Sequence, residues 1–309
     1  MSDFTFDRRP AALGDEYIRR MQLPDKLTFT KMEGLGNDYV YVWFDDLDSP
    51  LTDPCPLAAR IADRNFGVGG DGMILIGRSK TADFRMRMFN VDGSEGEMCG
   101  NATRCVGKYV YDHGLTDKTG LTLETLGGTR VLKLNLKNGK VDTVRVDMGK
   151  PRLRPADLPM SAPGESFINE EIVVDGKTYR GTAVSMGNPH FVLRVEELGG
   201  VGALDFPVFG PKFEKHELFP RRVNVEFIEV LSRDRLRMRV WERGSGETLA
   251  CGTGASASLV ACALNGWTGR SATVELRGGE LFIEWAEDGV VYMTGPAREV
   301  FSGEFNLRG

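Results

Sequence analysis

The sequence predicts an α/β protein composed of two related domains, and three observations lead to this expectation. Much of the chain consists of short segments rich in β-branched and aromatic residues, bounded by Gly, Asp, Asn and Pro, which is typical of strands. A few longer stretches carry helix signals at their ends. Segments of the first half also recur in the second half in the same order, which indicates a duplicated domain.

The repeat is clearest around two cysteines, Cys99 and Cys251. Residues 85–100 read RMRMFNVDGSEGEMCG and residues 237–252 read RMRVWERGSGETLACG, with six of sixteen positions identical and no gap. Flanking segments keep the same register: GNDYV at 36–40 with GNPHFV at 187–192, and LETLGG at 123–128 with VELRGG at 274–279. Chance similarity between Gly-rich turns does not explain matches in one order at a nearly constant offset of about half the chain.

The pattern predicts strands at ten places, five in each half of the chain. They are 26–32, 38–44, 72–77, 84–89 and 131–136 in the first half, and 179–186, 190–195, 224–230, 236–241 and 281–286 in the second.

Helices are predicted where capping residues bracket a longer segment. Residues 53–67 begin with Asp53 and Pro54, a favourable cap and first-turn pair, and stop at a glycine. Each key cysteine is followed by a helical segment, at 100–114 and at 252–266, and both end in glycine. The second is small and apolar on nearly all faces, so we expect it to be buried.

The chain is expected to divide into three parts. Residues 1–26 lie outside the repeat and form a charged extension, with a short amphipathic helix expected around 14–22. The first domain is predicted at 27–150, with Cys99, and the second at 151–309, with Cys251. The boundary is drawn at a proline-rich stretch, 149–167, that has few periodic apolar residues.

Composition excludes several functional classes. The net charge is −5 and basic residues are scattered, so no nucleic-acid surface is predicted. No apolar run is long enough to span a bilayer and the N-terminus lacks a secretory h-region, which favours a cytoplasmic protein. The five cysteines form no C-x-x-C pair and the chain has three histidines, so we expect free thiols and no metal site.

Cys99 and Cys251 are the candidate reactive groups because each begins a helix just before a glycine. A helix N-terminus lowers the pKa of a thiol and offers free N–H groups to a carboxylate. Cys55, Cys105 and Cys262 are interpreted as ordinary structural residues. If two related domains bring the two thiols to opposite faces of one carbon, one can remove a proton and the other can deliver one, which inverts a stereocentre without a cofactor.

Four segments resemble the signature segments of the diaminopimelate epimerases: GLGNDYV, DGSEGEMCGNATRC, SMGNPHFV and WERGSGETLACGTGA. The resemblance covers about residues 27–300. It implies interconversion of LL- and meso-2,6-diaminopimelate, in lysine and peptidoglycan precursor synthesis, without pyridoxal phosphate. It also implies a homodimer. Each chain would form two pseudo-symmetric domains, and each domain would be a β-barrel-like sheet wrapped around a central helix.

Matching the motifs residue by residue gives a candidate site. The resemblance implies Cys99 and Cys251 as the acid/base pair, and Gly100, Asn101, Gly252 and Thr253 as N–H donors to the reacting carboxylate. It implies Asn37, Asn90, Asn188 and Asn224 as substrate-binding amides, Glu242 and Arg243 as partners of charged groups, and His190 with Glu242 as residues that tune or position the thiols.

The chain departs from the family pattern at two positions. Gly72 stands where some members carry glutamine, so any role of Gly72 would be through its backbone. Ala102 follows Asn101 where glycine is frequent, which leaves the N–H groups in place.

Two other readings remain open from the sequence. A proline racemase or hydroxyproline epimerase also pairs two cysteines, but its first motif typically has histidine after C-G, where this chain has Asn101. Arg243 suits a second carboxylate, which a small ring substrate lacks. The other reading is a non-catalytic relative or a thiol redox protein, in which the two cysteines would be dispensable or would cycle through a disulfide.

Overall fold

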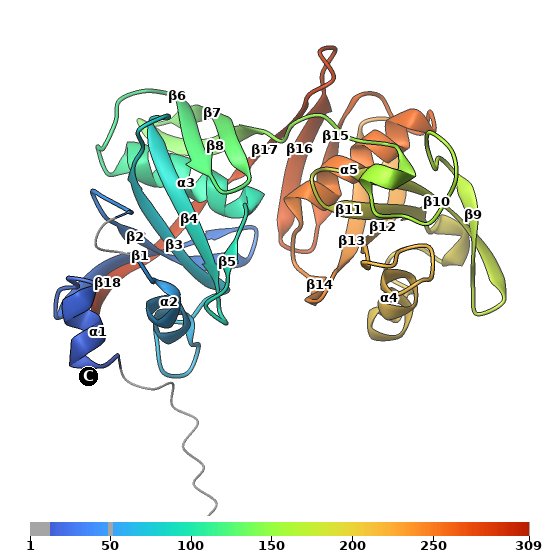
Figure 1. The fold of residues 1–309 in the computed structure, drawn as a ribbon. Helices are drawn as coiled ribbons and strands as arrows, with labels where there is room; N and C mark the ends of the chain where they lie inside the picture. Colours follow the sequence, from blue (N-terminus) through green and yellow to red (C-terminus); the bar gives the residue numbers. More distant parts are fainter. Residues whose placement is uncertain (1–12, 49–51, 309) are drawn as a thin grey trace, which may run out of the picture. The chain divides into compact units, whose positions relative to one another are not determined.

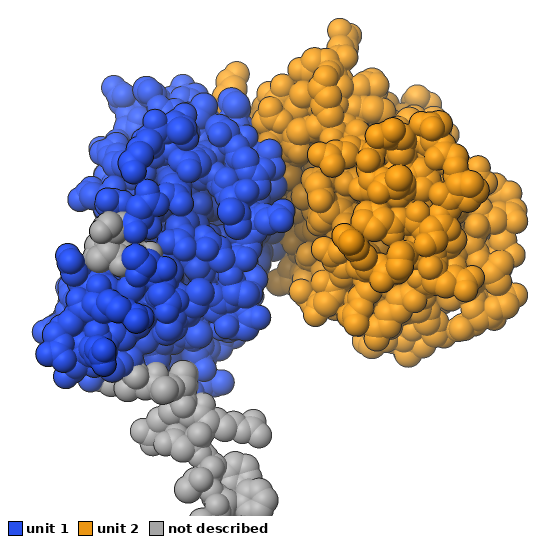
Figure 2. All heavy atoms as spheres, in the orientation of Figure 1, with its two compact units in different colours: residues 1–131, 297–309 blue, residues 132–296 orange. Residues whose placement is uncertain are grey.

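The computed structural model describes residues 13–48 and 52–308. The chain forms two compact units (Figure 2): unit 1 is Met1–Val131 with Ala297–Gly309, and unit 2 is Leu132–Pro296. These bounds differ from the expected 27–150 and 151–309. The last strand, β18 (Arg298–Asn306), returns to pair with β1 (Lys26–Gly34) of unit 1 (Figure 1). Strand β8 (Lys140–Asp147) pairs instead with β17 (Val291–Pro296) of unit 2.

Within its described residues, unit 1 is a mixed sheet with three helices. Its strands run in the order β18–β1–β2–β3–β4–β6, with β2–β3 and β4–β6 parallel, the other neighbours antiparallel, and β5 beside β4. The further elements are α1 (Asp15–Arg20), β2 (Asn37–Trp43), α2 (Cys55–Ala62), β3 (Gly72–Arg78), β4 (Phe84–Asn90), β5 (Glu95–Gly96), α3 (Gly100–Asp112) and β6 (Gly120–Thr125). β7 (Gly128–Lys137) carries the chain onward and pairs with β8.

Unit 2 repeats this plan and adds strands at one side. Its order is β9–β10–β11–β12–β13–β15–β16–β17–β8, with β11–β12 and β13–β15 parallel, and β14 beside β13. The elements not yet given are β9 (Glu170–Val174), β10 (Lys177–Ser185), β11 (Pro189–Arg194), α4 (Phe206–Glu214), β12 (Asn224–Ser232), β13 (Arg235–Glu242), β14 (Gly246–Thr248), α5 (Gly252–Leu264), β15 (Ser271–Leu276), β16 (Gly279–Trp285), and the 3-10 turns Pro155–Asp157 and Glu196–Leu198.

The predicted repeat is present in the strand order. The path β1–β2–α2–β3–β4–β5–α3–β6 recurs as β10–β11–α4–β12–β13–β14–α5–β15, with the same parallel and antiparallel pairings. Two ion pairs recur at aligned residues. Arg87–Glu95 at 2.8 Å matches Arg239–Glu247 at 2.7 Å, and Arg85–Glu124 at 3.6 Å matches Arg237–Glu275 at 3.0 Å.

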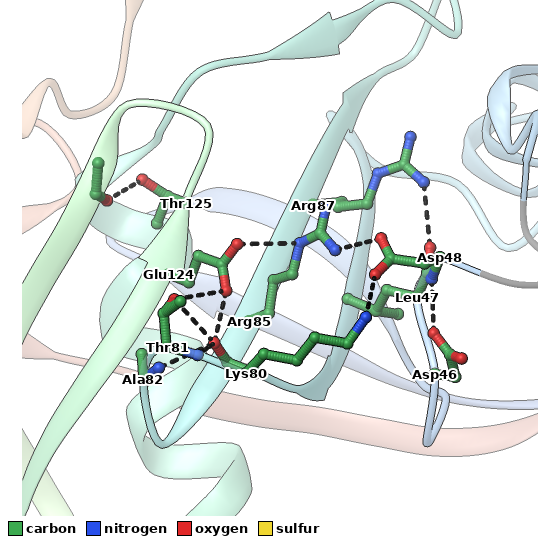
Figure 3. A network of polar contacts seen from close by, with 12 residues as sticks. Asp46, Leu47, Asp48, Lys80, Thr81, Ala82, Arg85, Arg87, Glu124 and Thr125 are labelled. Carbon is green, nitrogen blue, oxygen red and sulfur yellow. Dashed lines mark hydrogen bonds and ion pairs between the residues drawn. The ribbon is translucent and has the colours of Figure 1, made fainter.

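Figure 3 shows the network around one of these pairs, on the outer side of β4. The Arg85 guanidinium lies between the carboxylates of Glu124 and Asp48, and Lys80 also reaches Asp48 at 3.5 Å. Arg87 donates to the carbonyl of Leu47 at 3.3 Å. Because these groups lie at the surface and remain partly solvated, each pair contributes about 1 kcal/mol or less. Their recurrence therefore indicates common descent of the two units more than a large contribution to stability.

One helix lies against the sheet of each unit directly after its key cysteine. α3 contacts β1, β2 and β18 in unit 1, and α5 contacts β10, β11, β12, β15, β16 and β17 in unit 2. α5 is buried along nearly all of its length, as its small apolar sequence predicts. The sheets therefore wrap a central helix, and this confirms the fold class expected from the resemblance.

The N-terminal extension contributes to the core of unit 1. The helix expected around 14–22 is α1, and its Ile18, with the following Met21 and Leu23, is buried against Phe29 and Leu57 of the main sheet and α2. The first twelve residues of the predicted extension lie outside the described residues.

Among the helices that the structure describes, none is long and apolar enough to cross a membrane.

Candidate active site

Both key cysteines are the N-cap residues of the central helices. Cys99 has φ −129° and ψ 121° ahead of α3, and Cys251 has φ −126° and ψ 111° ahead of α5. Each carbonyl accepts the first helical hydrogen bond at 2.9 Å, from Thr103 and from Ala255 respectively. Since the first N–H groups of a helix have no acceptor within it, each thiol stands beside a group of donors suited to an anion.

In unit 1 the Cys99 thiol contacts Asn37. The thiol donates to the amide oxygen of Asn37 at 3.3 Å, while the Asn37 amide nitrogen donates to Asp71 at 2.7 Å. Arg64 holds the other oxygen of Asp71 at 2.8 Å. Asp71 therefore fixes the orientation of Asn37, with the oxygen toward the thiol. Asp71 and Arg64 were missed in the sequence because each also suits an ordinary surface ion pair.

Asn90 lies at the end of β4, opposite Gly72 on β3. Its amide donates to the hydroxyl of Ser94 at 3.0 Å. A Cβ atom built on Gly72 would lie 1.9 Å from the Phe89 carbonyl oxygen and 2.8 Å from the Tyr39 ring. This strand pairing leaves no room for a side chain at position 72, which agrees with the expectation that Gly72 can act only through its backbone.

A fully buried arginine lies in the first turns of α3. Arg104 donates to the side-chain oxygen of Asn101 at 3.0 Å and to the Gly100 carbonyl at 3.4 Å. Gly34 gives it room, since a Cβ there would lie 3.1 Å from the guanidinium. Burial lowers the pKa of Arg104, while the nearby Cys105 and Cys99 thiols favour its charged form. A guanidinium stays charged even so, and its charge favours the thiolate of Cys99.

In unit 2 a line of hydrogen bonds leads to Cys251, whose side chain is buried. Its sulfur lies 3.4 Å from the hydroxyl of Thr253, which lies 3.3 Å from the amide nitrogen of Asn188. The Asn188 oxygen is 2.9 Å from Nε2 of His190, and Nδ1 of His190 is 2.7 Å from Glu226. The structure thus brings together Asn188, His190, Thr253 and Cys251, and it adds Glu226.

Asn224 and Glu242 support the turn that carries Arg243. The Asn224 amide donates to the Pro189 carbonyl at 2.9 Å, and its oxygen accepts the backbone N–H of Arg243 at 2.9 Å. Asn224 therefore positions the turn, and its side chain is only 4% exposed. Glu242 accepts a hydrogen bond from the hydroxyl of Thr248. The guanidinium of Arg243 is exposed and donates to the Arg221 carbonyl at 3.4 Å.

The electrostatics of Cys251 differ from the expectation for a helix N-terminus. Burial, followed by the carboxylates of Glu242 and Glu226, raises the pKa of the Cys251 thiol well above its ordinary value. Bonds to Thr253 and to the backbone of Gly254 act in the expected downward direction but are outweighed. Burial also raises the pKa of Glu242. The prediction of a lowered pKa is therefore wrong for Cys251, because desolvation and like charge exceed the effect of the helix dipole.

This raised pKa predicts how Cys251 reacts with iodoacetamide. Only the thiolate is nucleophilic, so the alkylation rate of Cys251 should be low at pH 7 and rise about tenfold per pH unit, still climbing at pH 9. The measurement is mass spectrometry of the Cys251 peptide after timed exposure at pH 7, 8 and 9. A rate that levels off below pH 8 would contradict the assignment.

The other three cysteines have no comparable surroundings. All five are free thiols in the structure. Cys105 and Cys262 are fully buried in α3 and α5, and burial raises the pKa of Cys105 to about 11. Within residues 13–48 and 52–308, no group of three or more His, Cys, Asp and Glu side chains could hold a metal ion.

Comparison with known proteins points to the same family as the sequence motifs. The family model for diaminopimelate epimerase matches residues 29–154 and 182–300. The chain is 56% identical over 288 residues to a diaminopimelate epimerase of Leptospira biflexa, covering 91% of this chain and 100% of that one. It is 54% identical over 282 residues to a diaminopimelate epimerase of Acetivibrio thermocellus, covering 91% and 99%.

Solved structures with low sequence identity share the fold. A hydroxyproline epimerase from Agrobacterium vitis has a TM-score of 0.64 at 16% identity, with 91% of each chain covered. A phenazine biosynthesis protein of the PhzF family from Bacillus anthracis has a TM-score of 0.65 at 17% identity, covering 90% of this chain and 98% of that one. At such identity these likenesses concern the fold alone.

Proposed function

We propose, from the premise that this chain belongs to the diaminopimelate epimerase family, that it interconverts LL- and meso-2,6-diaminopimelate. The chain is thus an isomerase by family. The observation that carries the proposal furthest is the matched placement of Cys99 and Cys251, two N-cap thiols with nearly equal backbone angles on equivalent helices of a duplicated fold.

The proposed reaction is a proton transfer in two steps. The thiolate of one cysteine takes the α-hydrogen as a proton, and the thiol of the other delivers a proton to the opposite face of the same carbon. The electron pair of the broken C–H bond passes transiently onto the adjacent carboxylate. The N–H groups of Gly100, Asn101, Gly252 and Thr253 would bind that carboxylate and stabilise its added charge. Both transfers use thiols, so the proposal requires no pyridoxal phosphate.

The surroundings of the two thiols support different resting states. The buried guanidinium of Arg104 favours negative charge on Cys99, whereas Glu242 and Glu226 favour the protonated form of Cys251. A two-base epimerase needs one thiolate and one thiol in the free enzyme. When the reaction runs so that Cys251 must act as the base, Glu242 is the nearby carboxylate whose raised pKa suits it to take the Cys251 proton.

The remaining residues would recognise the charged ends of the substrate. Diaminopimelate carries two ammonium and two carboxylate groups, and the exposed guanidinium of Arg243 is suited to fork onto the distal carboxylate. Glu242 would pair with an ammonium group. The amides of Asn37, Asn90 and Asn188 would contact the polar groups near the reacting carbon, while Asn224 would act by holding Arg243.

The competing activity within the same fold is epimerisation or racemisation of proline. It is tested by incubating the purified protein with LL-diaminopimelate and with L-proline in deuterated buffer, and following stereochemistry and α-deuterium. We expect conversion of LL- to meso-diaminopimelate and no change in proline. Activity on proline alone would overturn the proposal. We also propose that the protein acts in lysine and peptidoglycan precursor synthesis. We propose in addition that it is a homodimer and that it is located in the cytoplasm.

A further inference from the structure

Glu226 is a buried carboxylate that the family motifs do not single out. It lies on β12 with 0% of its surface exposed, and Oε1 is 2.7 Å from Nδ1 of His190, which is also fully buried. Within the described residues, Oε2 has no hydrogen-bond partner. Burying a carboxylate costs several kcal/mol unless a charged partner compensates for the lost hydration. A fold that retains such a group needs a reason for it.

The duplicated unit shows that the fold itself does not require this carboxylate. On the parallel pair β11–β12, His190 faces Asn224, and on the equivalent pair β2–β3, Tyr39 faces Gly72. Two residues further along the second strand, unit 2 has Glu226 and unit 1 has Ile74, each fully buried. The same backbone thus accepts Tyr39 with Ile74 in one unit, so the His190–Glu226 pair is a chemical difference specific to the Cys251 side.

The hydrogen bonds from Glu226 to Cys251 have a defined direction. Nδ1 of His190 lies 2.7 Å from Glu226 and Nε2 lies 2.9 Å from the Asn188 amide oxygen, so the carboxylate fixes the ring with Nε2 toward Asn188. The Asn188 nitrogen must then donate to the Thr253 oxygen at 3.3 Å. That leaves the Thr253 hydroxyl hydrogen free to point at the Cys251 sulfur, 3.4 Å away.

We propose that Glu226 is a positioning residue for the Cys251 half of the site and acts through His190, Asn188 and Thr253. Its carboxylate holds the His190 ring in place, which orients the Asn188 amide and directs the Thr253 hydroxyl at the sulfur. A donor aimed at the sulfur stabilises the Cys251 thiolate each time Cys251 acts as a base. Glu242 and Cys251 are the other titratable groups that face this line of residues. The inference rests on the proposed function.

The test compares Glu226→Gln with Glu229→Gln. Glutamine keeps the size and one acceptor at position 226 but removes the charge. Glu229 lies on the same strand and binds Val201 and Arg237, away from His190. We expect Glu226→Gln to lower kcat for LL-diaminopimelate about 10- to 100-fold, as outer-shell partners of a site typically do, with KM within about threefold. Glu226→Asp should restore part of the loss, and Glu229→Gln should match the wild type.

A second readout does not depend on turnover. At pH 9 the iodoacetamide rate of Cys251 should rise at least about threefold in Glu226→Gln, because the variant removes a carboxylate that disfavours the Cys251 thiolate, while the rate of Cys99 stays unchanged within about twofold. A faster alkylation together with a lower kcat separates the loss of an oriented donor from the loss of the thiolate. The alkylation rate tests the coupling of Glu226 to Cys251 even if the protein does not epimerise diaminopimelate. An unchanged Cys251 rate, or an equal rise at both cysteines, would overturn the inference.

A third variant separates the positioning role of Glu226 from any contribution of this residue to folding. The double replacement His190→Tyr with Glu226→Ile copies the pair that unit 1 already contains, and exchanging a buried polar pair for less polar residues of similar volume is often neutral for stability. We expect this variant to melt within a few degrees of the wild type and to show the same faster Cys251 alkylation, because it also lacks the Glu226 carboxylate. If it retains wild-type kcat and Cys251 reactivity, the inference is wrong, whatever the behaviour of Glu226→Gln.

Discussion

Replacing either Cys99 or Cys251 with alanine is expected to abolish the epimerisation of LL-diaminopimelate. General acid–base groups contribute roughly 10²- to 10⁴-fold each, and inversion requires one group on each face of the carbon, so kcat should fall by at least about a thousandfold. The measurement is the rate at which pure LL-diaminopimelate becomes meso, followed by chiral chromatography with each purified variant.

The two variants should also differ from each other in hydrogen exchange. A remaining thiol can still remove the α-hydrogen from the face that it serves and return deuterium to that same face. Each variant should therefore exchange one stereoisomer slowly with retention, and the preferred stereoisomer should be opposite in Cys99→Ala and Cys251→Ala. Wild-type exchange of both stereoisomers by either variant would contradict the two-base proposal.

Cys55→Ala is the matched control for these variants. Cys55 is half-buried at the start of α2 and its ordinary surroundings raise the pKa of its thiol, mainly through burial. This replacement removes a thiol from a helix terminus without touching either central helix, and kcat should stay within twofold of the wild type. A loss comparable with that of Cys99→Ala would point to general damage by cysteine removal.

Local sequence signals were sufficient for the elements that carry the site. The starts of α3 and α5 follow from Cys-Gly steps and terminal glycines, and the ten predicted strands all coincide with strands of the structure. The helix α4 was missed because Pro207, Gly210 and Pro211 argue against a helix. The repeat could have found it, since α4 occupies the place of α2. The return of β18 to β1 is a pairing across nearly the whole chain, which no local pattern encodes.

The candidate site, like the fold, could be predicted from local sequence only in part. The motifs contain the two cysteines, Arg104 and Glu242, but they do not show that Arg104 is buried, and they do not contain Glu226. Arg104 lies at an interior position of a helix and Glu226 at an interior position of a strand, where a sequence pattern predicts apolar residues. Their importance depends on contacts with Asn101 and His190, which only the folded chain shows.

The equivalent places in the two units have diverged in charge while their backbones stayed alike. Arg104 bonds the Gly100 carbonyl at the start of α3, and at the start of α5 the hydroxyl of Ser256 bonds the equivalent Gly252 carbonyl at 2.9 Å. A buried cation thus lies near Cys99, and buried carboxylates lie near Cys251. This difference supports the view that the two thiols are tuned to opposite protonation states, because packing alone would have been served equally well by identical residues.

Introducing a side chain at Gly72 should be the most destabilising of the changes considered. A Cβ there would meet the Phe89 carbonyl oxygen at 1.9 Å, and this oxygen belongs to the paired strand β4, which cannot move independently. Overpacking of this kind costs about 1–3 kcal/mol when side chains can yield, and more when backbone must. We expect Gly72→Ala to lower the free energy of unfolding by at least about 3 kcal/mol, and Gly72→Gln by more.

Gly120→Ala is the control, because a Cβ at this first residue of β6 meets nothing within 4 Å and its stability should change by about 0.5 kcal/mol or less. Urea unfolding of the wild type and the variants, read as a shift in midpoint, measures both effects.

The stability of the Gly72 variants also decides how the chain can contact its substrate. If Gly72→Gln folds with wild-type stability, β3 must be able to separate from β4, and a glutamine side chain at this position could then reach the substrate. If it is strongly destabilised, the polar contact must come from elsewhere, and Asn90, which pairs with Gly72 on the facing strand, is placed to supply it.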